Sequence, residues 1–255
     1  MPIQNKLREN LATSDIVRIL IETDNVQLQR LPWHEWDLLE IYRHAEIGIS
    51  PPRYEKIKQS VKSTGKIKVL AIFGDSTGIN IEEDKRQLLN NLSNNADIKF
   101  LVSPQLIDIN DQLWEEGYDI LFFAGHSETT SDRGKIYINS EESLTISEFK
   151  FALKKAIESG LKIAIFNSCD GLGLAKDLID LHIPQIIVMR ERIPDKVAQE
   201  FLKYFLKEFY QNQSFYLAVR RARERLQGLE NKYPCASWLP IIYQNPACKP
   251  PEWQN

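Results

Sequence analysis

The sequence predicts an α/β fold, in which a doubly wound and mostly parallel sheet is flanked by helices. Two observations support this prediction. Short runs that are almost entirely apolar, bounded by turn residues, suit strands buried on both faces of a parallel sheet. Helical patterns alternate with these runs, which is typical of α/β proteins. The expected strands are 67–73, 119–124, 163–166 and 185–189, with 98–102 as a weaker fifth, and the expected helices between them are 81–92, 147–159 and 172–180.

Before this regular pattern, the first 65 residues predict an N-terminal appendage. Residues 18–29 alternate apolar and polar side chains around Thr23-Asp24-Asn25, which favours a β-hairpin with one buried face. Residues 32–42 carry apolar groups at helical spacing. A lysine-rich connection with Ser-Pro-Pro, residues 48–65, then marks the boundary with the main domain.

Local signals mark the elements that follow residue 130. The run Thr145-Ile-Ser-Glu148 fits a capping box at the start of the predicted helix 147–159, and Gly160 suits its C-terminal stop. Residues 135–144 interrupt the alternation of predicted strands and helices and indicate a β-hairpin on the surface. Two long helices are expected after the last apolar run, at 195–210 and 214–227.

The end of the chain predicts one more strand, residues 238–243. Because Pro240 cannot donate to a central ladder, we expect this strand at an edge of the sheet. The main domain is therefore predicted over 66–246. The Pro-rich residues 247–255 have the composition of a tail or of the start of a linker.

Composition and charge narrow the classes of function. The 255 residues carry 32 Lys and Arg against 35 Asp and Glu, a net charge of −3, and the pI is about 5.9. This balance gives no global reason to bind nucleic acid or an anionic membrane. No apolar run approaches the roughly 18 residues of a membrane span, and the first ten residues lack the apolar segment of a secretory signal. We therefore expect a soluble, cytoplasmic protein.

Metal, disulfide and nucleotide sites are not indicated. The three cysteines include no C-x-x-C pair, so neither a disulfide framework nor a zinc site is suggested. The four histidines lie far apart in the sequence. The turn Gly74-Asp75-Ser76-Thr77-Gly78 lacks the pattern of a phosphate-binding loop. No metal or organic cofactor is therefore expected.

Reactive side chains follow two of the predicted strands. In an open α/β sheet, reacting groups gather at the carboxyl ends of the strands. His126 follows one strand in Ala124-Gly125-His126-Ser127, and Cys169 follows another in Asn167-Ser168-Cys169-Asp170-Gly171. An imidazole can take the proton of a thiol, and the helix expected near Leu172 favours a thiolate at its N-terminus. These residues therefore predict a nucleophilic cysteine with a histidine base.

The two motifs resemble those of a known family. F-F-A-G-H-S at 122–127 and I-F-N-S-C-D-G at 165–171 are similar to the His and Cys motifs of CHAT domains, caspase-like peptidases of the same clan as separase. The segments that contain 187–205, 214–223 and 238–243 are similar to the tail of the family, so the resemblance covers about 66–246. L-P-W-H-E-W-D-L-L at 31–39 is like the region before CHAT in cyanobacterial multidomain proteins, where an NTPase sensor or repeat modules often follow.

The resemblance implies a caspase-like fold and a cysteine endopeptidase acting on proteins or peptides, with no cofactor. By position, His126 is the general base and Cys169 the nucleophile, and the backbone N–H groups of Cys169 and Ser127 form the oxyanion hole. Most relatives have Gly after the His, so Ser127 is a departure from the family pattern. Only residues 170–184 separate Cys169 from the next strand, so we expect control by another domain or partner rather than by self-cleavage.

The substrate pocket is not fixed by the resemblance. Many caspase-like enzymes that cut after Arg or Lys carry an Asp two residues before the Cys, where this chain has Asn167. Asp75, Asn167 and Asp170 are therefore the candidate pocket residues. A role as the cap of a helix or turn is favoured for Asp75 over a role in the pocket, and Asp170 is equally expected to be a charge at a helix N-terminus.

Simpler interpretations stand beside these. The remaining histidines (His34, His44 and His182) are expected in packing, surface or loop roles, the other cysteines (Cys235 and Cys248) to be inert, and the arginine group (Arg220, Arg221, Arg223 and Arg225) to form a solvated face. A rival of another class is a catalytically silent CHAT-fold module for interaction or signalling, with the N-terminal appendage as its docking surface. A receiver-like regulatory domain would need an acidic pocket, which the strand ends do not offer beyond Asp75.

Overall fold

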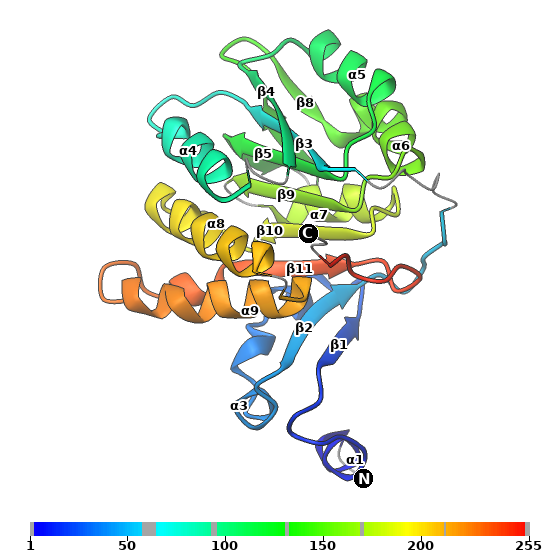
Figure 1. Cartoon of the computed structure of the whole chain (residues 1–255), viewed down its shortest axis with the longest axis vertical. Coiled ribbons are helices and arrows are strands. Elements are labelled where there is room, and N and C mark those ends of the chain that lie inside the picture. The colour runs from blue at the N-terminus through cyan, green and yellow to red at the C-terminus, as the bar shows by residue number, and fades with distance from the viewer. Residues whose placement is uncertain are drawn as a thin grey trace.

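A computed structural model describes residues 3–57, 65–92, 96–130, 133–168, 171–211 and 213–252. Its centre is an eight-stranded sheet of order β1-β2-β11-β10-β9-β5-β3-β4 (Figure 1). Neighbouring strands are parallel except for β10 and β11. The strands are β1 (Val17–Glu22), β2 (Ala45–Ser50), β3 (Ile67–Phe73), β4 (Ala96–Val102), β5 (Ile120–Gly125), β9 (Ile163–Ser168), β10 (Gln185–Met189) and β11 (Pro240–Gln244). The predicted α/β sheet, mostly parallel, is confirmed.

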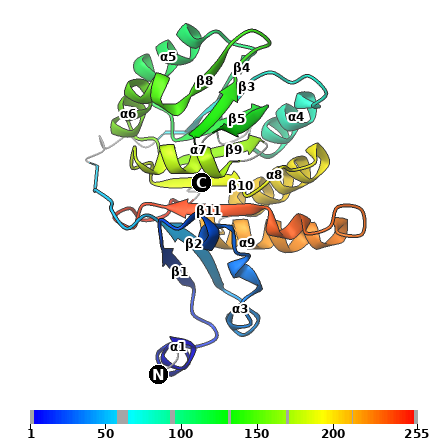
Figure 2. The ribbon, with the colours of Figure 1, turned by 180° about the vertical axis from the view of Figure 1, so that it is seen from behind.

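Helices cover both faces of the sheet. One face, turned to the viewer in Figure 1, carries α4 (Ile81–Leu92), α8 (Asp195–Tyr210) and α9 (Phe215–Arg225). The other face, turned to the viewer in Figure 2, carries α5 (Leu106–Glu115), α6 (Lys150–Glu158) and α7 (Leu172–Ile179). The shorter helices are α1 (Ile3–Asn10), α2 (Val26–Arg30), η1 (Trp33–Glu35), α3 (Leu38–Ile41), η2 (Ile146–Phe149), η3 (Leu226–Leu229) and η4 (Ala236–Trp238).

Strand β3 shows how an apolar run serves two cores. Its side chains point alternately to the two faces, as the period of two of a strand requires. Val69, Ala71 and Phe73 pack in the core under α4, α8 and α9. Leu70 and Ile72 pack in the core under α5, α6 and α7. The apolar runs are therefore strands buried on both faces, as predicted.

A second, three-stranded sheet lies beside the main one. It consists of β6 (Ser127–Thr130), β7 (Arg133–Tyr137) and β8 (Ser143–Thr145), all antiparallel. The predicted hairpin at 135–144 is confirmed in β7 and β8, but buried Ile136 and Leu144 make it part of a core rather than a purely surface feature. The capping box is also confirmed, because Thr145 N and Oγ1 both donate to Glu148 Oε2, at 2.6 and 2.9 Å.

The predicted hairpin at 18–29 is wrong. Strand β1 pairs with β2, and the pairing is parallel. Asn25 does not make a hairpin turn; its Oδ1 accepts hydrogen bonds from the N–H groups of Gln27 and Leu28 and so caps α2. The predicted helix at 32–42 is interrupted and becomes η1 and α3. Residues 48–50, placed in a connection, belong to the buried strand β2.

The last strand is not at an edge of the sheet, as we had expected. β11 lies between β10 and β2, antiparallel to the first and parallel to the second. Pro240 is tolerated because it is the first residue of the strand and β2 pairs only farther along, at Ile242 and Tyr243. Through this pairing β1 and β2 extend the main sheet, so the predicted division at residue 65 is not a division of the sheet.

Two of the four arginines that we expected on a solvated face of α9 are buried instead. Arg220 and Arg223 are buried, with 7% and 6% of their surface exposed. The Arg220 guanidinium donates to the carbonyls of Leu39, Tyr42 and Ala45, and Arg223 pairs with buried Glu46 at 2.7 Å. We call Arg220, Arg223 and Glu46 the arginine anchor, because they join α9 to the N-terminal segment.

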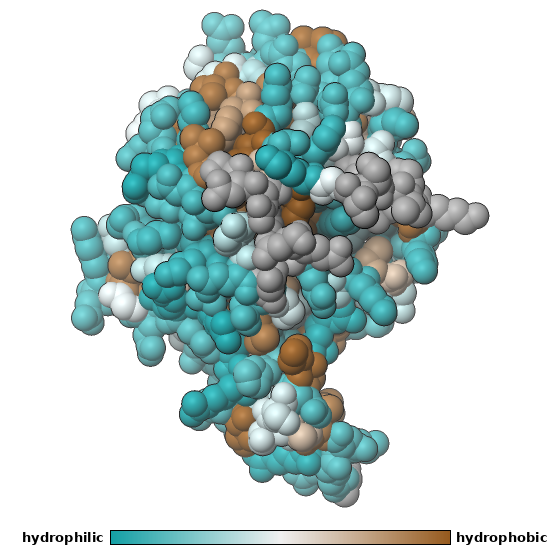
Figure 3. Space-filling view, viewed as in Figure 1, coloured by the Kyte–Doolittle hydropathy of each residue, from teal (hydrophilic) through white to brown (hydrophobic). Residues whose placement is uncertain are grey.

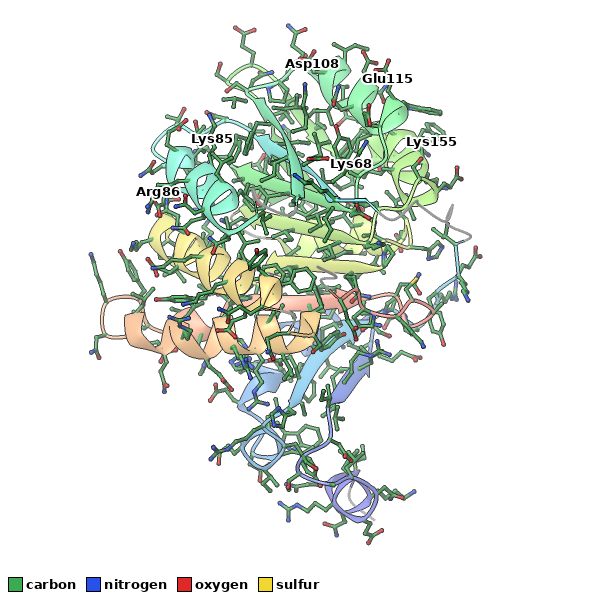
Figure 4. The ribbon with its side chains drawn as sticks, in the orientation of Figure 1. Lys68, Lys85, Arg86, Asp108, Glu115 and Lys155 are labelled. Atoms are coloured by element: carbon green, nitrogen blue, oxygen red, sulfur yellow. The ribbon has the colours of Figure 1, made fainter. Side chains whose placement is uncertain are left out.

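The outer surface is mostly hydrophilic in the view of Figure 3. Charged side chains stand on the outside of the helical layers, such as Lys85 and Arg86 on α4 and Asp108 and Glu115 on α5 (Figure 4). Within the described parts of the chain, no helix has the length and apolar character needed to cross a membrane.

Candidate active site

The two strands that precede His126 and Cys169 are neighbours in the sheet. β5 and β9 are parallel, and their register pairs Gly125 with Ser168. His126 follows Gly125 in the chain and Cys169 follows Ser168. Cys169 and Asp170 lie outside the described residues, so their predicted roles stay predictions.

The imidazole of His126 is held by the loop after β3. His126 Nε2 lies 2.8 Å from the carbonyl oxygen of Thr77. Because a carbonyl oxygen can only accept a hydrogen bond, Nε2 carries the proton in the neutral ring. Nδ1 then bears the lone pair, so it is the nitrogen that can take a proton from a thiol. Nothing in the sequence points to Thr77, because a backbone carbonyl contributes without regard to residue type.

Backbone hydrogen bonds fix the segment that carries His126. Its N–H donates to the carbonyl of Asp75 (3.1 Å), and its carbonyl accepts from the N–H of Tyr137 (3.0 Å). Gly125 has φ +153, and a Cβ there would lie 3.2 Å from the Asp75 carbonyl oxygen. A Cβ on Gly74 would lie 2.1 Å from the Tyr137 carbonyl oxygen. Glycine at these two positions therefore lets three segments meet around the histidine.

Asp75 caps a turn beside the histidine, as one of our two expectations stated. Its Oδ1 accepts from Thr77 Oγ1 (2.8 Å) and from the N–H of Thr77 (3.1 Å). These two bonds hold the pKa of the Asp75 carboxyl below its usual range, and the charge of His126 lowers it further. Asp75 is therefore a carboxylate that lies close to His126. Its role in a substrate pocket stays a prediction.

Ser127 is the first residue of β6. It is buried, with 9% of its surface exposed, and lies opposite Ile136 of β7. The pairing places its backbone at the junction between the main sheet and the small one. The expected role of its N–H group in an oxyanion hole stays a prediction.

Asn167, the third candidate pocket residue, is buried and turned toward α4. Its Nδ2 donates to Asp84 Oδ1 at 3.2 Å. Asp84 has 1% of its surface exposed. Burial raises the pKa of this carboxyl to about 8, and the negative charge of Asp195 adds to the rise. The sequence did not single out Asp84, which stands in Glu82-Glu83-Asp84 like an ordinary acidic start of a helix.

The other candidate groups lie in simpler surroundings. Cys235 is exposed, and burial raises the pKa of the Cys248 thiol. The side chain of His34 is packed against Trp238, and burial together with Arg223 and Arg190 lowers the pKa of its imidazole to about 2. His182 lies in the turn after α7 and His44 is exposed. Among the described residues, no three His, Cys, Asp or Glu side chains are grouped to hold a metal ion.

Comparisons with known proteins agree with this architecture. A family model described as "CHAT domain" matches residues 1–245. The structure is similar to the crystal structure of the Arg-specific cysteine proteinase gingipain R (RGPB), with a TM-score of 0.62 and 11% identity over 98% of this chain and 68% of that one.

It is also similar to a complex of Porphyromonas gingivalis RgpB pro- and mature domains, with a TM-score of 0.59 and 12% identity over 96% and 68% of the two chains. No curated protein matches the sequence. The family match includes β1 and β2, in agreement with their place in the main sheet. The chain therefore belongs to the CHAT domain family and has a caspase-like fold.

Proposed function

We propose that the protein is a cysteine endopeptidase that hydrolyses peptide bonds through a dyad of His126 and Cys169. The observation that carries this proposal is the pairing of Gly125 with Ser168 on neighbouring parallel strands. The residue that follows the first strand is His126, the proposed base, and the residue that follows the second is Cys169, the proposed nucleophile. The carboxyl edge of an α/β sheet is the usual place for such groups.

The tautomer of His126 supports the role of a base. Nε2 is bound to the Thr77 carbonyl, so the lone pair is on Nδ1. The Asp75 carboxylate beside the ring stabilises the imidazolium that forms when the thiol loses its proton. Helix α7 begins at Leu172, three residues after Cys169, and its N-terminal dipole favours a thiolate.

In the proposed reaction the Cys169 thiolate attacks the scissile carbonyl carbon. The C–N bond breaks as the protonated His126 transfers its proton to the leaving amine, which leaves a thioester on Cys169. Water, deprotonated by His126, then attacks this acyl-enzyme and releases the free acid and the thiol. The backbone N–H groups of Ser127 and Cys169 would stabilise the oxyanion of both tetrahedral intermediates.

The proposed substrate is a protein or peptide, and control is proposed to come from another domain or partner. Helix α7 starts directly after Gly171, so little irregular chain follows the nucleophile before the next strand. Caspase-type maturation by cleavage in this segment would have to cut a helix whose buried residues include Leu174 and Leu178. That burial favours regulation from outside this segment.

The test is the reactivity of Cys169 toward iodoacetamide between pH 5 and 9, followed by peptide mass mapping. We expect Cys169 to label fast at neutral pH, and Cys248, whose pKa is raised by burial, to label slowly. His126→Ala should slow labelling at neutral pH and lower peptidase activity about 10²–10⁴-fold. Cys169→Ala should abolish cleavage with the fold intact. Full cleavage by the Cys169→Ala variant would disprove the mechanism.

A second candidate is a catalytically silent module for interaction. The observation that favours it is the number of large apolar side chains exposed in the first 41 residues: Ile3, Ile16, Val26, Leu28, Leu31 and Ile41. Slow labelling of all three cysteines, without cleavage of any peptide pool, would support this candidate over the peptidase.

A further inference from the structure

Two consecutive residues before Cys169 bury polar atoms that have no hydrogen-bond partner in the described part of the chain. These atoms are Asn167 Oδ1 and Ser168 Oγ. Among the described residues, no other two neighbours in the sequence share this property. A buried polar atom without a partner costs about 1–3 kcal/mol, so such a pair at one strand end calls for an explanation.

The carboxyl that contacts this strand end comes from α4. Asp84 is on the first turn of the helix, where its neighbours Lys85 and Arg86 stand on the outer side (Figure 4). Asp84 itself points inward, and its Oδ1 accepts the hydrogen bond from Asn167 Nδ2. Both residues are buried, with 1% and 6% of their surface exposed.

The groups around Asp84 favour its neutral form. Asp195, at the start of α8, and Glu83, on α4, both raise its pKa, whereas the bond from Asn167 lowers it. Asp195 accepts hydrogen bonds from the N–H of Asn80 and from Gln199 Nε2. Lys196, which follows Asp195 on α8, is bonded to Glu200.

We propose that Asp84 is a positioning residue of the candidate peptidase site, whose carboxyl holds the side chain of Asn167 and thereby the end of the strand that leads into Cys169. This inference rests on the proposed function of Cys169. An ionised Asp84 can only accept, so it binds the Nδ2 end of the amide. A neutral Asp84 can donate to Oδ1 after the amide rotates, which gives the unpartnered oxygen a partner.

Protonation of Asp84 therefore sets which end of the Asn167 amide faces the helix and which faces the strand end. The two states of the pair keep one hydrogen bond each, but the Asn167 amide has opposite orientations in them. In the neutral state the Nδ2 end no longer donates to Asp84 and is free as a donor on the same face of the sheet.

The first experiment follows the side-chain amide of Asn167 in ¹H–¹⁵N spectra between pH 6 and 10. The signal is assigned by its loss in Asn167→Ser. In the wild-type protein it should shift with a midpoint near pH 8, where Asp84 ionises. Asp84→Asn should remove the transition. Glu82→Gln, which deletes an exposed charge from the same helical turn, should leave it in place. An Asn167 signal that does not titrate, or that titrates in Asp84→Asn, overturns the proposal.

The second experiment measures labelling of Cys169 over the same pH range in the same variants. The wild-type rate should depart from a single ionisation curve near pH 8, and Asp84→Asn should follow a single curve. Asp84→Ala, which removes the hydrogen bond, should slow labelling about tenfold across the range, as a displaced reacting group does. A labelling profile of Asp84→Asn identical to that of the wild type overturns the proposal. If Cys169 fails to label in the wild-type protein, the peptidase assignment fails instead, and the Asn167 signal still decides whether Asp84 holds the strand end.

Discussion

The carboxyl edge of the sheet and the arginine anchor both bury polar side chains, but the two regions bond them differently. In the anchor, Arg220 donates to three backbone carbonyls and Arg223 pairs with Glu46. At the carboxyl edge, Asp84 is buried against an amide rather than a cation, and Asn167 and Ser168 keep unpartnered atoms.

The difference separates a structural polar cluster from a candidate functional one. Charges that are buried together with their partners hold two segments in one arrangement. A carboxyl buried with only an amide keeps a shifted pKa, and shifted values gather at sites that do chemistry. Near the anchor, His34 and Arg190 line a cavity of about 20 Å³, large enough for one water molecule, and Arg190 Nε has no hydrogen-bond partner among the described residues.

The pH dependence of stability should show the largest effect. The folded pKa of Asp84 is raised from 3.8 to about 8, so the folded protein binds more protons than the unfolded chain between these values. The contribution of Asp84 to the free energy of unfolding therefore falls by on the order of 5 kcal/mol as pH rises from about 4 to about 8, and does not change further above that range. Asp84→Asn should lose this dependence in urea unfolding, and Glu82→Gln should keep it. Parallel curves for the wild type and Asp84→Asn would show that Asp84 is an ordinary surface-like carboxyl.

Breaking the anchor should have the next largest effect. Arg223→Ala leaves Glu46 buried without its cation, and should lower the free energy of unfolding by about 3–5 kcal/mol. Arg221→Ala is the matched control on the same helix, because Arg221 is half-exposed and pairs with Glu208. Its cost should be below about 1 kcal/mol. Equal costs of the two variants in urea unfolding would contradict the distinction between the buried and the surface pair.

The backbone at the carboxyl edge should give a smaller effect. Gly125→Ala puts a side chain on a residue with φ +153, against the Asp75 carbonyl, and should cost about 1–3 kcal/mol. It should also slow Cys169 labelling, because the next residue is His126. Gly228→Ala is the control, since a Cβ there meets nothing within 4 Å. Unchanged stability and labelling in Gly125→Ala would mean that the loop adapts without strain.

The parts of the fold that the sequence predicted well are those decided by local pattern. The bounds of β3, β10, α4 and α8 agree with the predicted ranges, since apolar runs and helical spacing are properties of the segments themselves. Which strands pair with each other, in contrast, is not decided by local pattern. Strand β1 has the alternation of a hairpin strand, but its partner is β2, more than twenty residues later. The place of β11 inside the sheet likewise depends on a strand from the other end of the chain.

The candidate site was predictable where residue type carries the chemistry. His126 follows a strand that the structure confirms, and Asp75 caps a turn as its type suggests. Thr77 contributes its backbone carbonyl, and Asp84 differs from an ordinary acidic residue because it is buried. Neither property can be predicted from the type of the residue. For the same reason Arg220 and Arg223 were taken as solvated, because the acceptors that bury them come from residues 39–46.

The pairing of Gly48 with Ile242 has a consequence for how the protein is made. A ribosome delivers β1 and β2 first, and they can pair with each other as soon as residue 50 has emerged. The free edge of β2 then has no partner until β11 has been synthesised, much later in the chain. During that interval an unpaired strand edge is available to other nascent chains. The sheet is therefore more exposed to association with other chains during synthesis than after folding is complete.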